Sequence, residues 1–254
     1  MKRLLLSLGV LVALVHLSIA GRERKTDFRN FVYKGPEGEG KYVVFVPPDY
    51  KGDKAYPLIL FLHGLGESGT EGVNQTKVGL GPAIKKMKKP FPFFAVFPQS
   101  QKRTWSANSD DGKRAVAILD EVQKNYKIDS KRIYLTGLSM GGFGTWSLAA
   151  KYPERWAAIA PICGGLFFSK DQNIDKSDKI KKIAEKIKDI PCWCFHGGAD
   201  KVVLPQRSRE IIAALKDAGG QPIYDEYEGV GHNSWDRAYG TAKLYDWLLK
   251  QKLK

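Results

Sequence analysis

One short segment constrains the fold of this chain more than any other. Residues 133–142 read IYLTGLSMGG, an apolar run that leads through a Gly-x-Ser-x-Gly pattern into a stretch predicted to be helical. A serine at such a sharp strand-to-helix turn is held in a strained conformation with its hydroxyl exposed. Gly137 and Gly141 are needed there because the turn brings backbone segments too close together for side chains. The segment therefore predicts a strand, a tight turn and a helix, with Ser139 as a nucleophile.

Short β-rich runs alternate with amphipathic stretches along the rest of the chain. Several of these runs are continuously apolar, as in strands that are buried on both faces. The strand candidates are Tyr42–Val46, Leu58–Leu62, Phe93–Phe97, Ile133–Thr136, Ala157–Pro161, Cys192–Phe195 and Ile223–Tyr227. The helix candidates are Asp111–Tyr126, Ser139–Lys151, Lys179–Lys188, Gln206–Ala218 and Ala238–Lys250. The alternation predicts an α/β fold, with a doubly wound, mostly parallel sheet and helices on both faces.

The first twenty residues have the pattern of a secretory signal peptide. Lys2 and Arg3 precede an apolar run from Leu4 to Leu17, which ends in the small-residue site Ser18-Ile19-Ala20. The run is shorter than the roughly 20 residues of a membrane-spanning helix, and no cysteine lies near the cut to carry a lipid. We therefore expect cleavage after Ala20, a secreted or periplasmic protein without a stable membrane anchor, and a single domain over residues 21–254.

The chain is strongly basic, with a formal net charge of +14 that falls to +12 when Lys2 and Arg3 are removed. This charge favours anionic partners such as an acidic polymer. The lysines are scattered, however, and no zinc-finger or RNA-recognition motif accompanies them. We expect no specific nucleic-acid partner. The alternative to an anionic partner is a basic surface that contacts only solvent.

The number of cysteines limits the disulfide bonds that a monomer can form. Cys163, Cys192 and Cys194 are an odd number, so at least one thiol is unpaired within a monomer. Cys192 and Cys194 alternate along one predicted strand and point to the same face. We interpret them as small buried hydrophobic residues, and a pairing with Cys163 is the alternative.

Four segments together resemble the α/β-hydrolase superfamily, and they span nearly the whole mature chain. They are His63–Gly69, Gly137–Trp146, Phe195–Asp200 with Val203 and Pro205, and Gly231–Trp235. Within the superfamily the chain is similar to secreted serine esterases of the feruloyl esterase and polyhydroxybutyrate depolymerase groups, and to predicted peptidases related to prolyl oligopeptidase. The resemblance implies the α/β-hydrolase fold and acyl-transfer chemistry. It does not imply a substrate, because one fold hosts many such reactions.

A serine nucleophile needs a base within reach and an acid that orients the base. His63 and His196 each end a predicted strand, whereas His232 lies in a glycine-rich loop after the last strand. The α/β-hydrolase order places the histidine after both nucleophile and acid, so His232 is the predicted base. We expect His63 and His196 to hold their loops through backbone hydrogen bonds. Their separation argues against a metal site.

The acid is predicted from its place after a strand. Asp200 follows the apolar strand Cys192–Phe195 through a tight Gly197-Gly198-Ala199 turn. An open α/β sheet places its site at the carboxyl ends of such strands. Asp225 and Glu226 lie within a strand and are weaker candidates.

The negative oxygen that forms during acyl transfer needs preorganised N–H donors. Met140 follows the nucleophile and supplies one backbone N–H. The loop His63-Gly64-Leu65-Gly66 follows the strand Leu58–Leu62 and offers the N–H of Leu65 as the second donor. The side chains of Leu65 and Met140 are incidental to this role.

Three further residues are candidates for substrate contact. The resemblance implies that Trp105, between the third strand and the next helix, lines the site, and a structural tryptophan in the core is the alternative. Glu67 is either a substrate contact or a carboxylate that organises its loop. Trp235 is either a substrate contact or packing under the His232 loop.

Together these residues predict a secreted serine hydrolase that cleaves carboxylic esters through an acyl-enzyme, with no metal and no organic cofactor. We expect a small-molecule or polysaccharide-linked ester with a short or aromatic acyl group. The connection Gly164–Asp189 is expected to cover part of the strand ends, but beyond residues 166–168 it is too polar for a long-chain lipase lid. The alternatives are a serine peptidase of the prolyl oligopeptidase-like group, and a catalytically silent binding protein on the same fold. The absence of a predicted gating domain disfavours the first, and the intact Ser, acid and His order disfavours the second.

Overall fold

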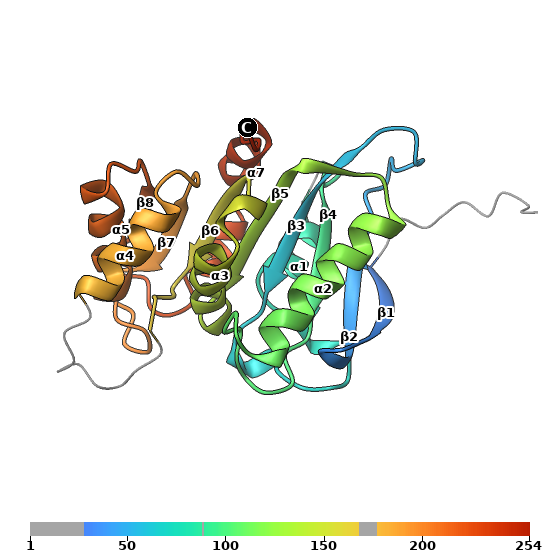
Figure 1. Cartoon of the computed structure of the whole chain (residues 1–254), viewed down its shortest axis with the longest axis horizontal. Helices are drawn as coiled ribbons and strands as arrows, with labels where there is room; N and C mark the ends of the chain where they lie inside the picture. The colour runs from blue at the N-terminus through green and yellow to red at the C-terminus, as the bar shows by residue number, and fades with distance from the viewer. Residues whose placement is uncertain (1–27, 88, 168–176) are drawn as a thin grey trace, which may run out of the picture.

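The computed structural model describes residues 28–87, 89–167 and 177–254, which form an eight-stranded sheet with helices on both faces (Figure 1). The strand order is β1-β2-β4-β3-β5-β6-β7-β8. The pairs from β4 to β8 along this order are parallel, whereas β2 pairs antiparallel with both β1 and β4. The predicted α/β fold with a mostly parallel sheet is confirmed. The predicted signal peptide, residues 1–20, lies outside the described residues.

The structure contains the strands in the predicted order, with one further strand at the start, one further helix before the Phe94 strand and two helices in place of the last predicted one. The strands are β1 Phe28–Gly35, β2 Gly38–Phe45, β3 Tyr56–Leu62, β4 Phe94–Pro98, β5 Ile128–Leu138, β6 Ala158–Ile162, β7 Trp193–Gly197 and β8 Ile223–Tyr227. The α-helices are α1 Leu80–Lys86, α2 Asp110–Asn125, α3 Met140–Lys151, α4 Ser177–Ile187, α5 Gln206–Asp217, α6 Trp235–Tyr239 and α7 Ala242–Lys250. A short 3₁₀ helix, η1 Leu65–Glu67, follows β3.

Two hydrophobic clusters fill the two faces of the sheet. One cluster joins the sheet to α2, α3, α4 and α5, and the other joins it to α1, α6 and α7. Figure 1 shows α2 and α3 in front of the sheet and α1 behind it. Every residue of β3, β4 and β6 is buried, because helices cover both faces of these central strands. No helix of the described residues is both long and apolar enough to cross a membrane.

The register brings the ends of the parallel strands to one edge of the sheet. Leu62 at the end of β3 pairs with Gly137, Leu138 at the end of β5 pairs with Ile162, and Ile162 pairs with Phe195 of β7. The loops that follow β3, β5, β7 and β8 therefore start side by side. These loops carry the residues that the sequence predicts for the site.

The predicted helix Ala238–Lys250 is wrong, because the structure has two helices in this region. α6 ends at Tyr239 and α7 begins at Ala242, with Gly240 and Thr241 between them. Thr241 has an extended backbone, with φ −90° and ψ 123°. Glycine and β-branched threonine both have low helix propensity, so the break occurs where the helix is weakest.

Candidate active site

Ser139 lies at the tight turn between β5 and α3. Its backbone has φ 52° and ψ −116°, a left-handed conformation that is rare for a residue with a side chain. A Cβ atom at Gly137 would lie 2.4 Å from the carbonyl oxygen of Gly141, and one at Gly141 would lie 1.9 Å from that of Leu62. The two glycines therefore let the turn pack directly on the end of β3, as the sequence predicts. The Ser139 N–H donates to the carbonyl of Ile162 at 3.0 Å, which fixes the turn to β6.

The structure brings Ser139, His232 and Asp200 together from three different loops. His232 Nε2 lies 2.9 Å from Ser139 Oγ, and His232 Nδ1 lies 2.7 Å from Asp200 Oδ2. Because a carboxylate only accepts, Nδ1–H donates to Asp200 and leaves the Nε2 lone pair facing the serine hydroxyl. This is the hydrogen-bond order in which an imidazole accepts a proton from a serine.

Buried hydrogen bonds hold the Asp200 carboxylate in place. Asp200 is 3% exposed, and its Oδ1 accepts the N–H groups of Val202 at 2.8 Å and Val203 at 3.0 Å. The Asp200 loop is also tied to the His232 loop, because the Ala199 N–H donates to the carbonyl of Val230 at 2.9 Å. This backbone hydrogen bond joins the two loops that carry the acid and the base.

The two predicted oxyanion donors begin short helices at the same edge of the sheet. Met140 is the first residue of α3, so its N–H has no acceptor within the helix. Leu65 is the first residue of η1, directly after the extended Gly64. The Leu65 side chain is 38% exposed, whereas the Met140 side chain packs in the core. Both N–H groups thus belong to segments that directly follow the paired strands β3 and β5.

His63 supports the loop that carries Leu65. Its Nε2 accepts the N–H of Ser100 at 3.0 Å, and its Nδ1–H donates to the carbonyl of Gly64 at 2.6 Å. Burial lowers the pKa of His63 to about 4, so the ring is neutral near pH 7. The Trp105 indole N–H donates to the His63 carbonyl at 3.0 Å, and the ring is only 2% exposed. This buried position favours the structural alternative for Trp105.

A polar network after β4 supports His63 and was not predicted from the sequence. Ser100 Oγ donates to Asp111 Oδ2 at 2.6 Å, and the Lys102 N–H donates to the same oxygen at 2.7 Å. Arg114 forms a buried ion pair with Asp111. The signal that could have found this network is the polar run Gln99-Ser100-Gln101, which directly follows a strand that is apolar throughout.

Glu67 and Trp235 both lie beside residues of the site. Burial raises the pKa of the Glu67 carboxyl, and hydrogen bonds from the backbone of Gly64 oppose this shift. Trp235 is half-buried, and its ring meets the His232 ring edge to face at 5.3 Å between centroids. Both contacts are internal to the loops, which favours the loop-organising and packing alternatives.

His196 and Cys163 lie close to Asp200. His196 Nε2–H donates to the Val203 carbonyl at 2.9 Å and lies 3.3 Å from Asp200 Oδ2, while its Nδ1 lies 2.7 Å from Ser208 Oγ. Burial lowers the pKa of His196, so it supports the acid loop as a neutral ring. The three cysteines are free and buried, as interpreted from the sequence for Cys192 and Cys194. Burial raises the pKa of the Cys163 thiol to about 12.

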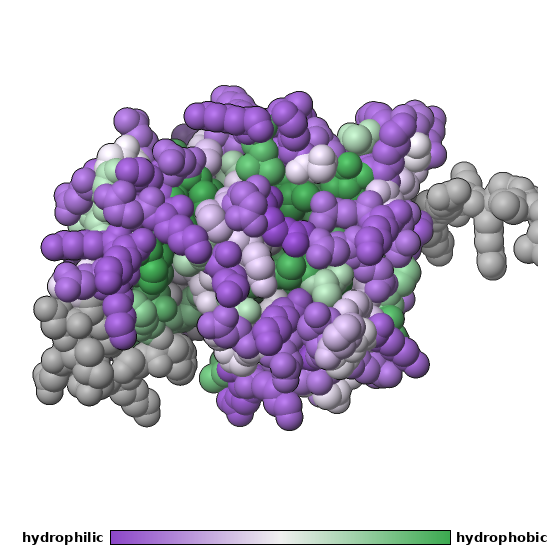
Figure 2. All heavy atoms as spheres, viewed as in Figure 1, coloured by the Kyte–Doolittle hydropathy of each residue, from purple (hydrophilic) through white to green (hydrophobic). Residues whose placement is uncertain are grey.

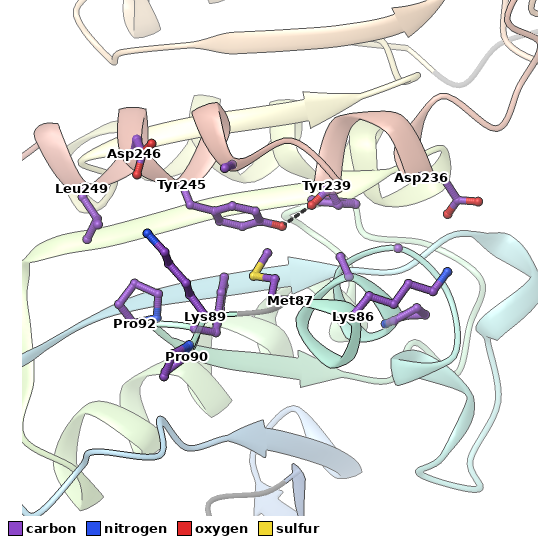
Figure 3. A pocket seen from close by; sticks show the side chains of 16 residues that line it. Lys86, Met87, Lys89, Pro90, Pro92, Asp236, Tyr239, Tyr245, Asp246 and Leu249 are labelled. Atoms are coloured by element: carbon purple, nitrogen blue, oxygen red, sulfur yellow. Dashed lines mark hydrogen bonds between the residues drawn. The ribbon is translucent and has the colours of Figure 1, made fainter.

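A separate cavity of about 630 Å³ lies between α1, α6 and α7. Figure 3 shows Lys86 and Lys89 on one side of it and Asp236, Tyr239 and Tyr245 on the other, with Tyr245 Oη donating to the Tyr239 carbonyl at 2.7 Å. No member of the Ser139, His232 and Asp200 group lines this cavity. It is therefore distinct from the place where an ester would meet Ser139.

Comparison with known protein families shows to which family this chain belongs. Residues 34–250 match the family model described as "Putative esterase". The chain belongs to this esterase family. The predicted resemblance to α/β-hydrolase esterases is thereby confirmed, and the match covers the three loops that meet at Ser139.

Individual relatives of this esterase are distant in sequence. The chain is 26% identical over 219 residues to the bifunctional acetylxylan esterase/xylanase XynS20E of Neocallimastix patriciarum. This match covers 85% of this chain and 29% of that protein. The chain is 25% identical over 206 residues to the probable feruloyl esterase C of Aspergillus niger, which covers 80% of this chain and 72% of the relative.

A solved structure described as a thermostable esterase is also similar to this esterase. It has a TM-score of 0.78 and 35% identity, with 89% of this chain and 63% of that chain covered. This chain therefore spans less than two thirds of the thermostable esterase and less than a third of XynS20E. The family and the fold follow from these matches, whereas the reaction and its substrate are argued below.

Proposed function

We propose that this esterase is a secreted serine hydrolase that cleaves carboxylic esters through a covalent acyl-enzyme. The observation that carries the proposal is the hydrogen-bond chain from Ser139 Oγ through the His232 ring to Asp200, with distances of 2.9 and 2.7 Å. A serine hydroxyl is a weak nucleophile by itself, so a base at hydrogen-bond distance is the feature that makes it reactive.

The geometry supports a two-stage reaction. In the first stage Ser139 Oγ attacks the ester carbonyl carbon while His232 Nε2 takes the hydroxyl proton, and the protonated ring then gives that proton to the leaving alcohol. In the second stage water attacks the acyl-enzyme with His232 again as base. The Asp200 carboxylate stabilises the imidazolium in both stages, because it accepts the Nδ1–H bond and is itself fixed by two backbone N–H groups.

Two backbone N–H groups would stabilise the negative oxygen in each tetrahedral intermediate. Those of Leu65 and Met140 begin η1 and α3, which follow the neighbouring parallel strands β3 and β5. Loss of a single such donor costs roughly 3 to 4 kcal/mol of transition-state stabilisation. The His63, Ser100 and Asp111 network supports this role, since it fixes the loop that carries Leu65.

For the substrate, we propose an ester with a short or aromatic acyl group, on a small molecule or a polysaccharide. The support is the relatives' names, an acetylxylan esterase/xylanase and a probable feruloyl esterase. Secretion is supported by the predicted signal peptide at residues 1–20 and by the match to an uncharacterized secreted protein of Arthroderma benhamiae. Because the reaction needs only side chains and backbone N–H groups of this chain, we propose no cofactor.

The proposal is tested with the Ser139→Ala variant and a set of ester substrates. We expect Ser139→Ala to lose hydrolysis of p-nitrophenyl acetate and methyl ferulate, and to lose labelling by an organophosphonate, while thermal unfolding stays near that of the parent. Ser106→Ala, at an exposed serine outside the site, is the matched control and should keep both activities. Labelling of a serine other than Ser139 would contradict the mechanism.

The acyl preference is measured with the parent protein on p-nitrophenyl esters of increasing acyl length and on aminoacyl anilides. We expect kcat/KM to fall from acetyl toward palmitoyl p-nitrophenyl esters, and aminoacyl anilides to be poor substrates. Rates that rise steadily with acyl length would contradict the proposed preference. Faster cleavage of the anilides than of the esters would instead support the peptidase alternative.

A further inference from the structure

The thiol of Cys163 lies directly behind the proposed catalytic residues. Cys163 follows the last residue of β6, and its N–H donates to the Phe195 carbonyl of β7 at 2.8 Å. Its backbone has a left-handed φ of 41°, which is rare for a residue with a side chain. The Cys163 Sγ, a carboxylate oxygen of Asp200 and a ring nitrogen of His232 lie within 4.8 Å of one another. The proposed reaction uses the last two groups and leaves the thiol without a role.

A second observation at this place points to a ligand. Ser234 is fully buried, and its Oγ has no hydrogen-bond partner of ordinary geometry among the described residues. This hydroxyl lies beside the Cys163 thiol. A thiol is a weak hydrogen-bond partner, so the buried Ser234 hydroxyl is poorly satisfied. The thiol, the imidazole, the carboxylate and the hydroxyl thus converge on one small volume.

We propose that Cys163, Asp200 and His232 form an inhibitory site for a thiophilic divalent cation such as Zn²⁺. A thiolate, an imidazole nitrogen and a carboxylate oxygen are the ligands that zinc takes in proteins, and Ser234 Oγ or water completes a tetrahedral set. With metal–ligand bonds of about 2.0 to 2.3 Å, tetrahedral ligand atoms lie about 3.3 to 3.6 Å apart. The three ligand atoms, which lie within 4.8 Å of one another, therefore need to shift by about 1 Å to bind one ion. The His232 and Asp200 atoms move apart, and the Cys163 thiol moves toward them.

The chemistry of coordination explains why the ion would inhibit. The thiol gives up its proton to solvent and binds as thiolate. The ring nitrogen that faces Asp200 is Nδ1, so a metal there takes the Nδ1 lone pair and places the ring proton on Nε2. The Nε2–H then points at Ser139 Oγ, and the ring cannot accept the serine proton. This inhibitory step rests on the proposed role of His232, whereas binding of the ion does not.

The local structure gives an ion a path to these ligands. The His232 side chain is 20% exposed, whereas Asp200 and Cys163 are buried behind it. The space beside the Gly231 Cα is open, since an added Cβ there would meet nothing within 4 Å. An ion would therefore reach the buried thiol and carboxylate past the partly exposed His232 ring.

The chain offers a matched control for the test. Cys194 is also buried, its Sγ lies 3.4 Å from Ser208 Oγ, and its residue lies two positions before His196. It does not belong to the group of three that surrounds Asp200 and His232. Cys163→Ser and Cys194→Ser therefore each remove one buried thiol, but only the first removes a proposed ligand.

Binding is measured without reference to activity. Titration of the parent with Co²⁺ should give the thiolate-to-cobalt charge-transfer band and the intense visible bands of a tetrahedral site. Cys194→Ser should give the same bands, and Cys163→Ser should lack the charge-transfer band. Co²⁺ bands of equal strength in Cys163→Ser would overturn the proposal. Thermal unfolding of each variant checks that it is folded.

Inhibition is then measured with Zn²⁺ on p-nitrophenyl acetate, each variant being compared with its own activity in EDTA. The inhibition constant should rise by more than about tenfold in Cys163→Ser and stay near the parent value in Cys194→Ser, because even outer-shell partners contribute ten- to hundredfold to metal affinity. Equal inhibition of all three proteins would overturn the proposal. Cobalt bands without inhibition would keep the binding site and contradict His232 as the base, which separates the two proposals.

Discussion

At the scale of single residues, the assignment of the acid depends on one hydrogen bond. Asp200 contacts His232 Nδ1 at 2.7 Å, whereas Asp225, a weaker candidate from the sequence, accepts the Trp193 indole N–H at 3.2 Å. Asp200→Asn should lower kcat by about 10³- to 10⁴-fold, since an amide cannot hold the imidazole in the correct tautomer. Asp225→Asn keeps an acceptor for Trp193 and should stay near the parent rate. A similar loss in both variants, measured with p-nitrophenyl acetate, would contradict the assignment.

The buried His63 should make the fold sensitive to acid. Its pKa is about 4 in the folded chain against 6.5 for the ordinary side chain, so between these values the unfolded chain binds more protons. The free energy of unfolding should therefore fall as the pH decreases from 6.5 to 4, and His63 accounts for about 3 kcal/mol of this loss. Below pH 4 the ring is protonated in both states and the loss is complete.

Urea unfolding at several pH values measures this effect of His63. His63→Gln has no group that titrates in this range, so its free energy of unfolding should fall less steeply from pH 6.5 to 4. The other titrating groups, including His196, are common to both proteins and cancel in the difference. Parallel curves for the parent and His63→Gln would show that the His63 ring does not carry the acid sensitivity.

At the scale of elements, the sequence was most informative where strands are buried on both faces. β3, β4, β6 and β7 differ from prediction by one or two residues at either end, because continuous apolar runs mark them. The partly exposed edge strand β8 also has the predicted bounds. β1 was not predicted, since it is an edge strand whose residues, with the exception of Tyr33, are partly or fully exposed and show no clear apolar pattern. α1 was also missed, since Gly81 and Pro82 occupy its first turn, where proline is tolerated but gives no helical pattern.

The site could be predicted for a related physical reason. Ser139, Asp200 and His232 follow predicted strands and have side chains whose chemistry is specific, and the structure brings them within hydrogen-bond distance. The supporting contacts of Ser100 and Asp111 join segments whose proximity depends on tertiary packing. Spacing along the chain carries no signal for such contacts. The position of Cys163 behind the site could not be predicted for the same reason.

The packing of α3 on β3 depends on the absence of a side chain at Gly141. A Cβ there would lie 1.9 Å from the Leu62 carbonyl oxygen, and a strand backbone cannot move aside as a flexible side chain can. Gly141→Ala should lower the free energy of unfolding by about 3 kcal/mol or more. Gly66→Ala is the matched control, because a Cβ at Gly66 meets nothing within 4 Å, and it should change stability by less than about 1 kcal/mol. Equal denaturation midpoints for the two variants would contradict this account of the turn.

At the scale of the whole molecule, charge rather than hydrophobic surface is the dominant feature. The face shown in Figure 2 is mostly hydrophilic, with smaller hydrophobic areas between the polar residues. The chain carries 41 Lys and Arg residues against 27 Asp and Glu residues. A positive field of this kind attracts polyanions and raises their local concentration near the surface. It has little effect on a small neutral ester, which diffuses to Ser139 without electrostatic steering.

The charge therefore predicts a difference between substrates rather than a general effect of salt. For an O-acetylated polyuronate, KM should rise as NaCl increases from low concentration to about 0.5 M, because screening over about 8 Å at physiological ionic strength already weakens attraction between separated charges. The kcat value should stay constant, since the bond cleavage at Ser139 does not involve the surface lysines. Acetylxylan and p-nitrophenyl acetate are uncharged controls and should show a nearly constant KM over the same range. If KM for the polyuronate is also constant, the basic residues form a solvated surface without a polymer partner. A rise in KM confined to the acidic polymer would instead identify the positive surface as the part of the molecule that selects among esters with the same acyl group.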